Sequence, residues 1–285
     1  RRHTRLTCDW SSDVCSSDLT ILDSADAVWG SSELVLKVKE PIAAEFARMR
    51  RDQVLFTYLH LAASRECTDA LIKSGITAIA YETVEVNGTL PLLAPMSEVA
   101  GRMAAQVGAA ALQRSNGGRG VLLGGVPGVR PGKVLILGAG TAGLAAATIA
   151  HGMRADVTVI DINQKRLSEV DQMFAGTVKT LMSNIHEIEE QALQSDLIIG
   201  AVLVHGARAP RLISNSLVKS MKPGSVLVDI AIDQGGCFED SRPTTHAEPT
   251  YKVHESIFYC VANMPGAVPF TSTYALSNAT LRYAT

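Results

Sequence analysis

Apolar and polar positions follow the pattern of an α/β protein, most regularly after residue 132. Short apolar runs, among them KVLILG, DVTVID, SDLIIGAVL and SVLVDIAI, are separated by stretches with helical spacing such as TAGLAAATIAHGM and QKRLSEVDQMFA. A last apolar run, IFYCVA, ends just before Asn263. Strands that are apolar throughout and alternate with helices predict a doubly wound parallel sheet that is buried on both faces.

The segment between residues 20 and 132 has a less regular pattern. We expect a strand in SELVLKVKEP, a helix in AAEFARMRRD, a buried strand in QVLFTYLHL and a short helix in CTDALIKSG. The dipeptide Asn87-Gly88 lies between two β-prone runs and predicts a hairpin turn. A long alanine-rich helix follows, with Ser97 as its expected N-cap. A glycine-rich stretch then separates this first α/β region from the second.

Residues 1–19 have a different character from the rest of the chain. The tract RRHTRLTCDWSSDVCSSDL has no helical or strand periodicity and is rich in Arg, Ser and Asp. It is not a signal peptide, because no apolar segment follows its basic start. It resembles translated sequencing-adapter sequence, so we expect it to be non-native and leave it out of the fold prediction.

Composition narrows the class of protein without naming a function. The 285 residues suffice for two domains, and 47% hydrophobic with 19% charged residues indicates a soluble protein with a sizeable core. A net charge of -2 gives no reason to expect nucleic acid or a membrane surface as partner, and no apolar run is long enough to span a bilayer. The five cysteines form no metal-binding pattern, which favours a reducing cytoplasm and no metal site.

A glycine motif lies between the first strand and the first helix of the second region. It reads Gly138, Ala139, Gly140, Thr141, Ala142 and Gly143, which fits G-x-G-x-x-G. Its glycines permit a tight turn, close approach of a pyrophosphate and helix–strand packing, and the helix N-terminus offers free N–H groups. Asp161 ends the next strand, where a carboxylate accepts hydrogen bonds from ribose hydroxyls and repels a 2′-phosphate. The motif predicts NAD, rather than NADP, as cofactor.

Two lysines in the first region are candidates for substrate binding. Lys37 and Lys39 are two positions apart in VLKVKEP, so on a strand they share one face. They are either solvated residues of an edge strand or ammonium groups that face a cleft and bind a carbonyl or carboxylate.

Polar residues also follow the later strands of the second region. Asp233 comes after the apolar strand in VLVDIAIDQGG, and Asp229 lies within that strand, where nearby backbone donors can satisfy it. Asn263 follows the last strand and either meets a nicotinamide or caps a helix. The carboxyl ends of parallel strands are where such sheets bind ligands, so each position is a candidate site residue.

One histidine, His60, lies in the mostly apolar run VLFTYLHLAA. The local sequence permits two interpretations, a hydrogen-bonded core residue and a group that moves protons in a reaction.

The motifs together resemble the alanine dehydrogenase family. The resemblance rests on LKVKEP, FTYLHLAA, LPLLAPMSEVAGRMAAQVGA, GGVPGV, the glycine motif, DIAIDQGGCFE and VANMPGAVP, which occur in family order between about residues 20 and 280. The transhydrogenase α subunit shares this architecture. The resemblance implies a Rossmann NAD-binding domain at residues 96–270 and an incomplete α/β substrate domain at residues 20–95 with 271–285, separated by a cleft.

The resemblance also implies an activity and roles for individual residues. The family oxidatively deaminates L-alanine to pyruvate and ammonium with NAD, reversibly, and usually forms a homohexamer. By resemblance, His60 is the general acid/base, Asp233 the second catalytic residue and Lys39 the substrate-binding lysine. Outside the glycine motif, positions that match NAD contacts of the family are Ser97, Asp161, Arg166, Ser183, Val202, Leu203, Ile230, Ala231, Ile232, Arg242, Val261, Ala262, Asn263 and Met264.

These residue types suit that chemistry. Hydride loss from the alanine Cα gives an iminium that water attacks, and a histidine near neutral pKa takes a proton from that water and returns one to the departing amine. A lysine holds the developing carbonyl oxygen by charge-assisted hydrogen bonds.

The sequence departs from the family at both ends. We find no match for the family's N-terminal strand, loop and helix, whose arginine binds the substrate carboxylate, and the family continues beyond NATLRYAT. We therefore expect this polypeptide to bind NAD more convincingly than it oxidises alanine. Two alternatives stay open, hydride transfer between nucleotides as in the transhydrogenase α subunit and a non-catalytic NAD-binding module.

Overall fold

A computed structural model describes residues 20–284 except residue 203 and residues 205–208. The prediction that residues 1–19 are non-native lies outside these residues. The chain divides into two compact units, Arg1–Thr57 with Glu66–Ile79, and Tyr58–Arg65 with Ala80–Thr285. The boundary therefore places His60 and the glycine motif in the second unit and Lys39 in the first.

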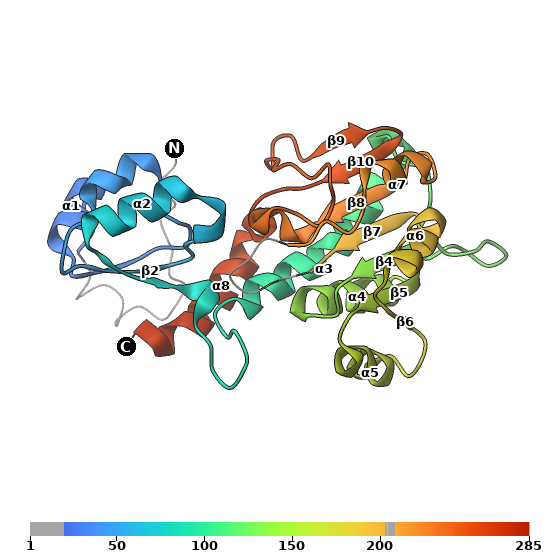
Figure 1. The fold of residues 1–285 in the computed structure, drawn as a ribbon, viewed down its shortest axis with the longest axis horizontal. Coiled ribbons are helices and arrows are strands. Elements are labelled where there is room, and N and C mark those ends of the chain that lie inside the picture. Colours follow the sequence, from blue (N-terminus) through green and yellow to red (C-terminus); the bar gives the residue numbers. More distant parts are fainter. Residues whose placement is uncertain (1–19, 203, 205–208, 285) are drawn as a thin grey trace. The chain divides into compact units, whose positions relative to one another are not determined.

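The first unit contains a three-stranded sheet of order β1-β2-β3. Figure 1 labels its strand β2 together with the helices α1 and α2. β1 and β2 are parallel, with Leu34 opposite Val54, and the amide N–H of Thr77 donates to Gln53 O. Trp29, from the helix before β1, and Leu71, from the helix between β2 and β3, are buried. The elements up to the third strand are α1 (Ala25–Ser31), β1 (Leu34–Leu36), η1 (Ala43–Arg48), β2 (Val54–Thr57), η2 (Leu61–Ala63), α2 (Arg65–Ser74) and β3 (Thr77–Ala80).

Three predictions for the first region are wrong in detail. The first strand ends at Leu36, before either lysine, and the expected helix after Pro41 is the 3-10 helix η1. The expected hairpin is reduced to one bridge between Val86 and Thr89 around the Asn87-Gly88 turn, because η3 (Tyr81–Thr83) interrupts the preceding β-prone run. Local propensity predicted extended chain here, but the tertiary structure uses a turn.

The second unit confirms the predicted doubly wound sheet. Its seven strands have the order β6-β5-β4-β7-β8-β10-β9, and all neighbouring pairs are parallel except β10 with β9. The sequence did not lead us to expect β9, an edge strand whose burial alternates. The strands are β4 (Lys133–Leu137), β5 (Asp156–Asp161), β6 (Lys179–Met182), β7 (Leu197–Gly200), β8 (Val226–Asp229), β9 (Thr250–Val253) and β10 (Ser256–Tyr259).

Helices cover both faces of this sheet. Alternate residues of β4 point to opposite sides: Val134 and Ile136 join a core with α3 and α4, whereas Leu135 and Leu137 join a core with α6 and α7. Both cores are closed to solvent, which explains why the central strands β4, β7 and β8 are apolar between their ends. The remaining elements are α3 (Ala94–Ala111), η4 (Arg114–Asn116), α4 (Thr141–Gly152), α5 (Gln164–Met173), α6 (Ile185–Gln194), α7 (Asn215–Ser220), η5 (Ile230–Gln234), η6 (Met264–Ala267) and α8 (Pro269–Ala284).

The long helix α3 begins earlier than its sequence predicted. Its N-cap is Leu93, and the amide N–H of Ser97 already donates to Leu93 O within the helix. Pro95 lies in the first turn, where a missing N–H costs nothing. Ser97 is therefore a helical residue and not the N-cap.

Helix α8 covers most of residues 271–285, which the resemblance assigned to the substrate domain. It packs against α3, within the second unit. The domain boundaries drawn from the resemblance stay a prediction. No helix in the described part of the chain combines the length and the apolar character that a membrane crossing requires.

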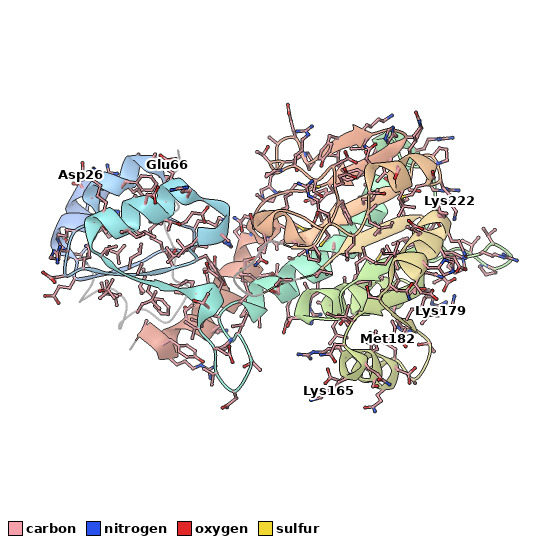
Figure 2. All side chains as sticks on the ribbon, in the orientation of Figure 1. Asp26, Glu66, Lys165, Lys179, Met182 and Lys222 are labelled. Atoms are coloured by element: carbon pink, nitrogen blue, oxygen red, sulfur yellow. The ribbon has the colours of Figure 1, made fainter. Side chains whose placement is uncertain are left out.

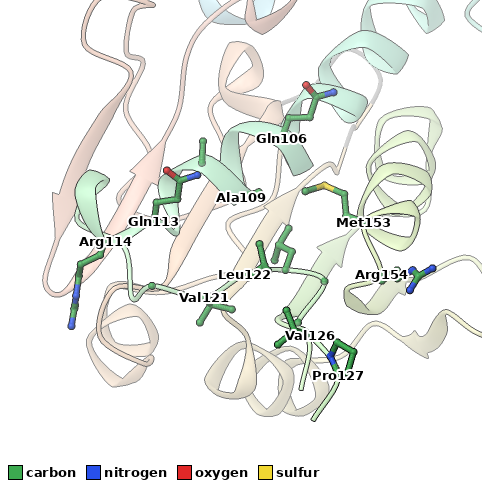
Figure 3. A pocket seen from close by; sticks show the side chains of 15 residues that line it. Gln106, Ala109, Gln113, Arg114, Val121, Leu122, Val126, Pro127, Met153 and Arg154 are labelled. Carbon is green, nitrogen blue, oxygen red and sulfur yellow. The ribbon is translucent and has the colours of Figure 1, made fainter. Parts of the chain in front are cut away.

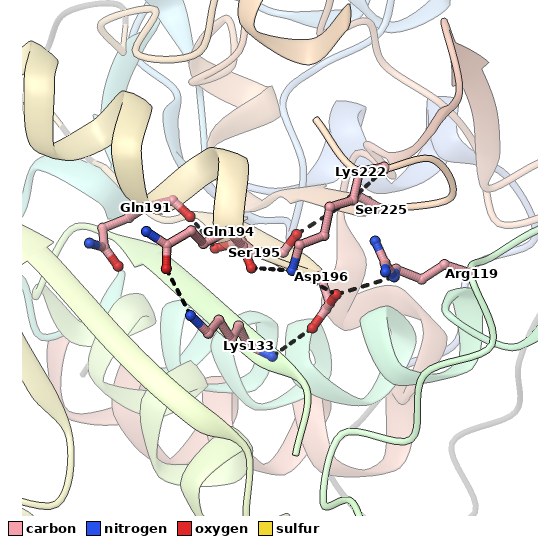
Figure 4. Close-up of polar contacts among 8 residues, drawn as sticks. All are labelled: Arg119, Lys133, Gln191, Gln194, Ser195, Asp196, Lys222 and Ser225. Atoms are coloured by element: carbon pink, nitrogen blue, oxygen red, sulfur yellow. Dashed lines mark hydrogen bonds and ion pairs between the residues drawn. The ribbon is translucent and has the colours of Figure 1, made fainter. Parts of the chain in front are cut away.

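Charged groups gather at the amino ends of the central strands (Figure 4). The buried side chain of Asp196, directly before β7, accepts a hydrogen bond from the amide N–H of Lys133 at 2.8 Å. Its other oxygen pairs with Arg119 Nε at 3.2 Å and Lys222 Nζ at 3.4 Å. The side chain of Asp196 thereby joins β4, the start of β7 and two connecting segments at the edge of the sheet opposite to the glycine motif.

We expect Asp196→Ala to lower the free energy of unfolding by about 2 kcal/mol, because it leaves a buried N–H and two cations without their acceptor. Urea denaturation measures the change. The matched control is Asp156→Ala, which removes the ion pair with Lys179, a lysine side chain that is 62% exposed. The control should cost less than about 1 kcal/mol, and equal costs for both variants would contradict a structural role for the Asp196 cluster.

Candidate active and nucleotide-binding site

The glycine motif turns the chain from β4 into α4. Gly138 has a φ of 101°, and a Cβ there would lie 2.8 Å from Ala201 O. A Cβ on Gly143 would overlap the carbonyl oxygen of Gly138, so helix and strand pack too closely for a side chain. Gly140 is the N-cap of α4, and a Cβ added to it would meet nothing within 4 Å. The open space before a helix N-terminus without a side-chain cap fits a pyrophosphate, with Thr141 and Ala142 in the first turn.

Asp161 ends β5 beside the glycine motif. Its Oδ2 accepts from the amide N–H of Ala139 at 2.6 Å, and its Oδ1 accepts from that of Asn163 at 2.7 Å. The amide N–H of Ser183, just after β6, donates to Asp161 O at 2.9 Å. Each carboxylate oxygen retains a lone pair, so the site has acceptors for ribose hydroxyls where two neighbouring strands end.

Charged and apolar side chains share the outer rim of this edge. Arg166 is exposed on α5, and its guanidinium pairs with Glu169 at 2.9 Å. The side chains of Lys165 and Met182 lie at the margin of the second unit, on α5 and β6 (Figure 2). Arg166 therefore lies on the surface, five residues after Asp161 in sequence. Its guanidinium is already engaged in an ion pair with Glu169.

Strand β8 leads into η5, which carries the predicted residues Ile230, Ala231, Ile232 and Asp233. Ala231 and Ile232 are buried, whereas Ile230 and Asp233 are half-buried. The predicted contact Val202 follows β7 and is half-buried, and the predicted contact Leu203 lies outside the described residues. These segments extend the site along the carboxyl edge of the sheet.

Asp229 has the structural role that its sequence position allowed. Its buried carboxylate accepts from the amides of Ala231 at 3.0 Å and Cys237 at 2.8 Å, and from Ser241 Oγ at 2.5 Å. Burial raises its pKa, and these hydrogen bonds act in the opposite direction. Asp229 therefore fixes both η5 and the turn that leads to Arg242. The exposed guanidinium of Arg242 stacks on the Tyr251 ring, 4.0 Å from its centroid.

The last predicted cofactor segment, Val261, Ala262, Asn263 and Met264, follows β10 and enters η6. Asn263 has φ 60° and ψ 51°, in the left-handed region, and its carbonyl oxygen lies 3.1 Å from His246 Nε2. Helix η6 packs against α3, which carries the half-buried Ser97. The structure thus brings these two predicted contact segments together.

His60 lies in a turn and not in a strand. β2 ends at Thr57, and His60 has φ 47° and ψ 42°, a conformation that few residues with a Cβ adopt. Its imidazole is half-buried and stacks on Tyr58, with 5.9 Å between the ring centroids and 21° between the planes. The two residues before it, Tyr58 and Leu59, are buried, which accounts for the mostly apolar run around the histidine.

The second unit also brings the two predicted catalytic residues into neighbouring segments. η2 begins directly after His60 and packs against η5, which contains Asp233. These segments are about 170 residues apart in sequence, so no local pattern indicated their contact. A histidine and a carboxylate on adjacent turns at the carboxyl edge can move protons beside a bound nucleotide.

Comparisons with known proteins agree with this architecture. Residues 15–100 match the N-terminal domain of the alanine dehydrogenase/PNT family, and residues 104–285 match its C-terminal domain. Alanine dehydrogenase of Mycolicibacterium smegmatis is 64% identical over 272 residues, which cover 95% of this chain and 73% of the relative.

This chain belongs to the alanine dehydrogenase/PNT family. Alanine dehydrogenase of Geobacillus stearothermophilus is 59% identical over 256 residues, 89% of this chain and 68% of the relative. A solved L-alanine dehydrogenase has a TM-score of 0.85 at 56% identity, with 93% of this chain and 73% of that chain covered. A transhydrogenase from Sinorhizobium meliloti has a TM-score of 0.76 at 23% identity and covers 92% and 76%; it shares the fold.

The lysines of the alanine dehydrogenase/PNT motif LKVKEP follow β1 in the first unit. Lys37 Nζ pairs with Glu45 of η1, and Lys39 Nζ lies 3.4 Å from Glu40 Oε2. Val38 between them is 53% exposed. Lys39 is half-buried, while its backbone oxygen accepts from Thr57 Oγ1 at 3.0 Å.

Several residues around the family motifs were not singled out by their sequence. Glu82 binds the backbone at His60, Tyr58 stacks on its ring, and Ser241 binds Asp229. Each lies in an ordinary local pattern, so only the tertiary contacts identify it.

A wide, largely apolar hollow of about 1140 Å³ lies elsewhere in the second unit (Figure 3). Gln106 of α3, Leu122 and Met153 are among the residues that line it. Met153 follows the carboxyl end of α4, whereas the glycine motif forms its amino end. The hollow is therefore separate from the predicted nucleotide site.

We expect Ser241→Ala to lower the free energy of unfolding by about 2 kcal/mol where Asp229 is ionised, because its buried carboxylate loses a hydroxyl donor. A carboxyl whose folded pKa is raised contributes stability below its unfolded pKa and loses it as pH rises through the folded pKa. The hydroxyl donates to the anion, so its removal should cost more as pH rises through the folded pKa of Asp229 than below it. Denaturant titrations over a series of pH values measure this dependence.

The control for this pH effect is Ser225→Ala, which removes a buried hydroxyl whose acceptor is the neutral carbonyl of Lys222 at 2.6 Å. Its cost should not depend on pH. A cost of Ser241→Ala that is equally independent of pH would show that the hydroxyl does not act on the charge of Asp229.

Proposed function

We propose that this chain catalyses the reversible, NAD-dependent oxidative deamination of L-alanine to pyruvate and ammonium. The observation that carries the proposal is the packing of η2 on η5, which places the segments of His60 and Asp233 side by side in a chain 64% identical to a named alanine dehydrogenase. Sequence similarity supports the substrate, and the carboxyl edge of the sheet supports the nucleotide.

NAD is the proposed cofactor, and it supplies the hydride acceptor when bound. The glycine motif and the start of α4 would hold its pyrophosphate, and Asp161 would bind the adenosine ribose. The carboxylate of Asp161 opposes a 2′-phosphate, which favours NAD over NADP. Ser183, Arg242 and the segment from Val261 to Met264 are proposed further contacts.

The chain's own residues would manage protons and charge. His60 takes the proton from the water that attacks the substrate iminium and returns a proton to the departing amine. Asp233 orients that water or stabilises the positive iminium. Lys39, through the resemblance of its motif, is the proposed ligand of the substrate oxygen.

The remaining expectations belong to the same proposal. We infer a cytoplasmic enzyme of amino-acid catabolism that works on small molecules without nucleic acid or membrane partners. A homo-oligomer, a hexamer by family resemblance, is the proposed assembly. Size-exclusion chromatography with light scattering tests it.

We expect His60→Ala to lower kcat for L-alanine oxidation by about 10² to 10⁴-fold, because a positioned general acid/base contributes that much. NAD affinity should change less than about twofold, since the glycine motif is untouched. NADH formation at 340 nm and calorimetric titration with NAD measure the two quantities. Asp233→Asn should lower kcat in the same way.

The control is His186→Ala on α6, whose imidazole is 84% exposed and should leave both quantities unchanged. Tight NAD binding without alanine oxidation by the unsubstituted chain would contradict the enzyme and support a nucleotide-binding module. Hydride transfer to a second nucleotide, without alanine oxidation, would support a transhydrogenase instead.

We expect Asp161→Asn to improve NADP affinity relative to NAD by about tenfold, about 1.4 kcal/mol, because the charge that opposes a 2′-phosphate is removed. Titration of both nucleotides measures the ratio. Asp156→Asn removes the same charge at the opposite end of β5 and should leave the ratio unchanged. An unchanged ratio in Asp161→Asn would refute the proposed role of this carboxylate.

A further inference from the structure

The turn that presents His60 is bound by a carboxylate from a later part of the chain. Glu82 lies in η3, 22 residues after His60, and is half-buried. Its Oε1 accepts from the amide N–H of His60 at 2.7 Å and from that of Leu59 at 3.1 Å. Its Oε2 lies 3.2 Å from the same Leu59 nitrogen. One side chain therefore binds two consecutive backbone donors.

This arrangement has the form of a backbone anion site. Successive N–H groups converge on one acceptor when the chain passes through a left-handed residue, and the resulting concavity favours negative charge. His60 is that residue, with φ 47° and ψ 42°. The conformation is unfavourable for a residue with a Cβ. The charge-assisted hydrogen bonds that the carboxylate of Glu82 accepts offset this conformational free energy.

A second set of contacts fixes the ring rather than the backbone. Tyr58 stacks on the imidazole, its hydroxyl donates to Leu92 O at 2.5 Å, and its ring meets Tyr81 edge-on at 5.1 Å. Burial and the negative charge of Glu82 raise the pKa of the Tyr58 phenol, so it stays protonated and keeps donating. Glu82 and Tyr81 are neighbours in η3, which links the two sets of contacts.

The geometry distinguishes an indirect role from a direct one. The oxygens of Glu82 accept from backbone N–H groups, and the shorter contact is to His60 itself. A carboxylate bound in this way is poorly placed to exchange protons with a substrate, but it determines where the following imidazole can point.

We propose that Glu82 is a positioning residue, whose carboxylate holds the turn of Leu59 and His60 in its left-handed conformation and so orients the imidazole. The inference rests on the proposed function for its catalytic consequence, because orientation matters only if His60 moves protons. The conformational part rests on the hydrogen bonds alone.

The test compares Glu82→Ala and Glu82→Gln with the unsubstituted chain. Hydrogen–deuterium exchange resolved to the amides of Leu59 and His60 should be about tenfold faster in the alanine variant, because the acceptor is lost. Glutamine keeps one acceptor oxygen and should give intermediate exchange. Glu85→Ala, an exposed carboxylate three residues later, is the matched control and should not change the exchange of these amides.

The kinetic arm asks whether the turn matters for the reaction. Glu82→Ala should lower kcat for alanine oxidation by about tenfold to a hundredfold, since small misplacements of a catalytic group have effects of this size. Glutamine should restore part of the loss, and NAD affinity should stay within about twofold, which also shows that the variant is folded. In a His60→Ala background, Glu82→Ala should cause no further loss, because Glu82 acts through His60.

Each outcome decides a separate point. Amides that exchange equally fast in all variants would overturn the hydrogen-bonded turn. Faster exchange with an unchanged kcat, or a further loss in the His60→Ala background, would overturn the positioning role. If the unsubstituted chain does not oxidise alanine, the proposed function fails, and the exchange rates still decide whether Glu82 holds the turn.

Discussion

Burial of the seven-stranded sheet on both faces is the constraint on which the second unit depends. A strand covered by helices on each side has no place for polar side chains along its length, so they gather where the strands begin or end. At the amino ends, the side chain of Asp196, directly before β7, binds the first residue of β4 and two cations from connecting segments. At the carboxyl ends lie the glycine motif, Asp161 and η5.

Carboxylates that accept from backbone N–H groups organise the carboxyl edge. Asp161 binds the amide of Ala139 in the glycine motif, and Asp229 binds those of Ala231 and Cys237. Glu82 binds the amide of His60. Loops at this edge cannot use sheet or helix hydrogen bonds, so side-chain acceptors satisfy their donors and fix their shape. These loops are therefore ordered by contacts within the chain itself.

The sequence predicts best what depends on neighbouring residues. Apolar runs of strand length identified β4 and its parallel neighbours. The spacing from Gly143 to Asp161 led us to propose a nucleotide site at the carboxyl edge. The sequence prediction failed at the start of α3, whose N-cap is Leu93 rather than Ser97. It also failed at β9, an edge strand that pairs antiparallel with β10.

Candidate site residues divide in the same way. Residues in motifs could be proposed from sequence, and the resemblance supplied most of them. The contact between η2 and η5 could not be proposed from sequence, because segments so far apart in the chain share no local pattern. Glu82 is the clearest case: its segment YET offers no signal, and its partners are backbone atoms, whose positions depend on the fold and not on residue identity.

A left-handed conformation at His60 is not, by itself, a sign of function. Asp52, Asn87 and Ala175 also have positive φ, and all three are exposed. Glycine would adopt such a turn at lower cost. At His60, however, glycine would remove the imidazole, and here a carboxylate binds the turn while an aromatic ring stacks on the side chain. The chain stabilises an unfavourable conformation here with a hydrogen-bonded carboxylate and a stacked ring, although glycine would adopt it at lower cost. This arrangement is expected where the side chain itself is needed, so we treat the turn as part of the proposed site.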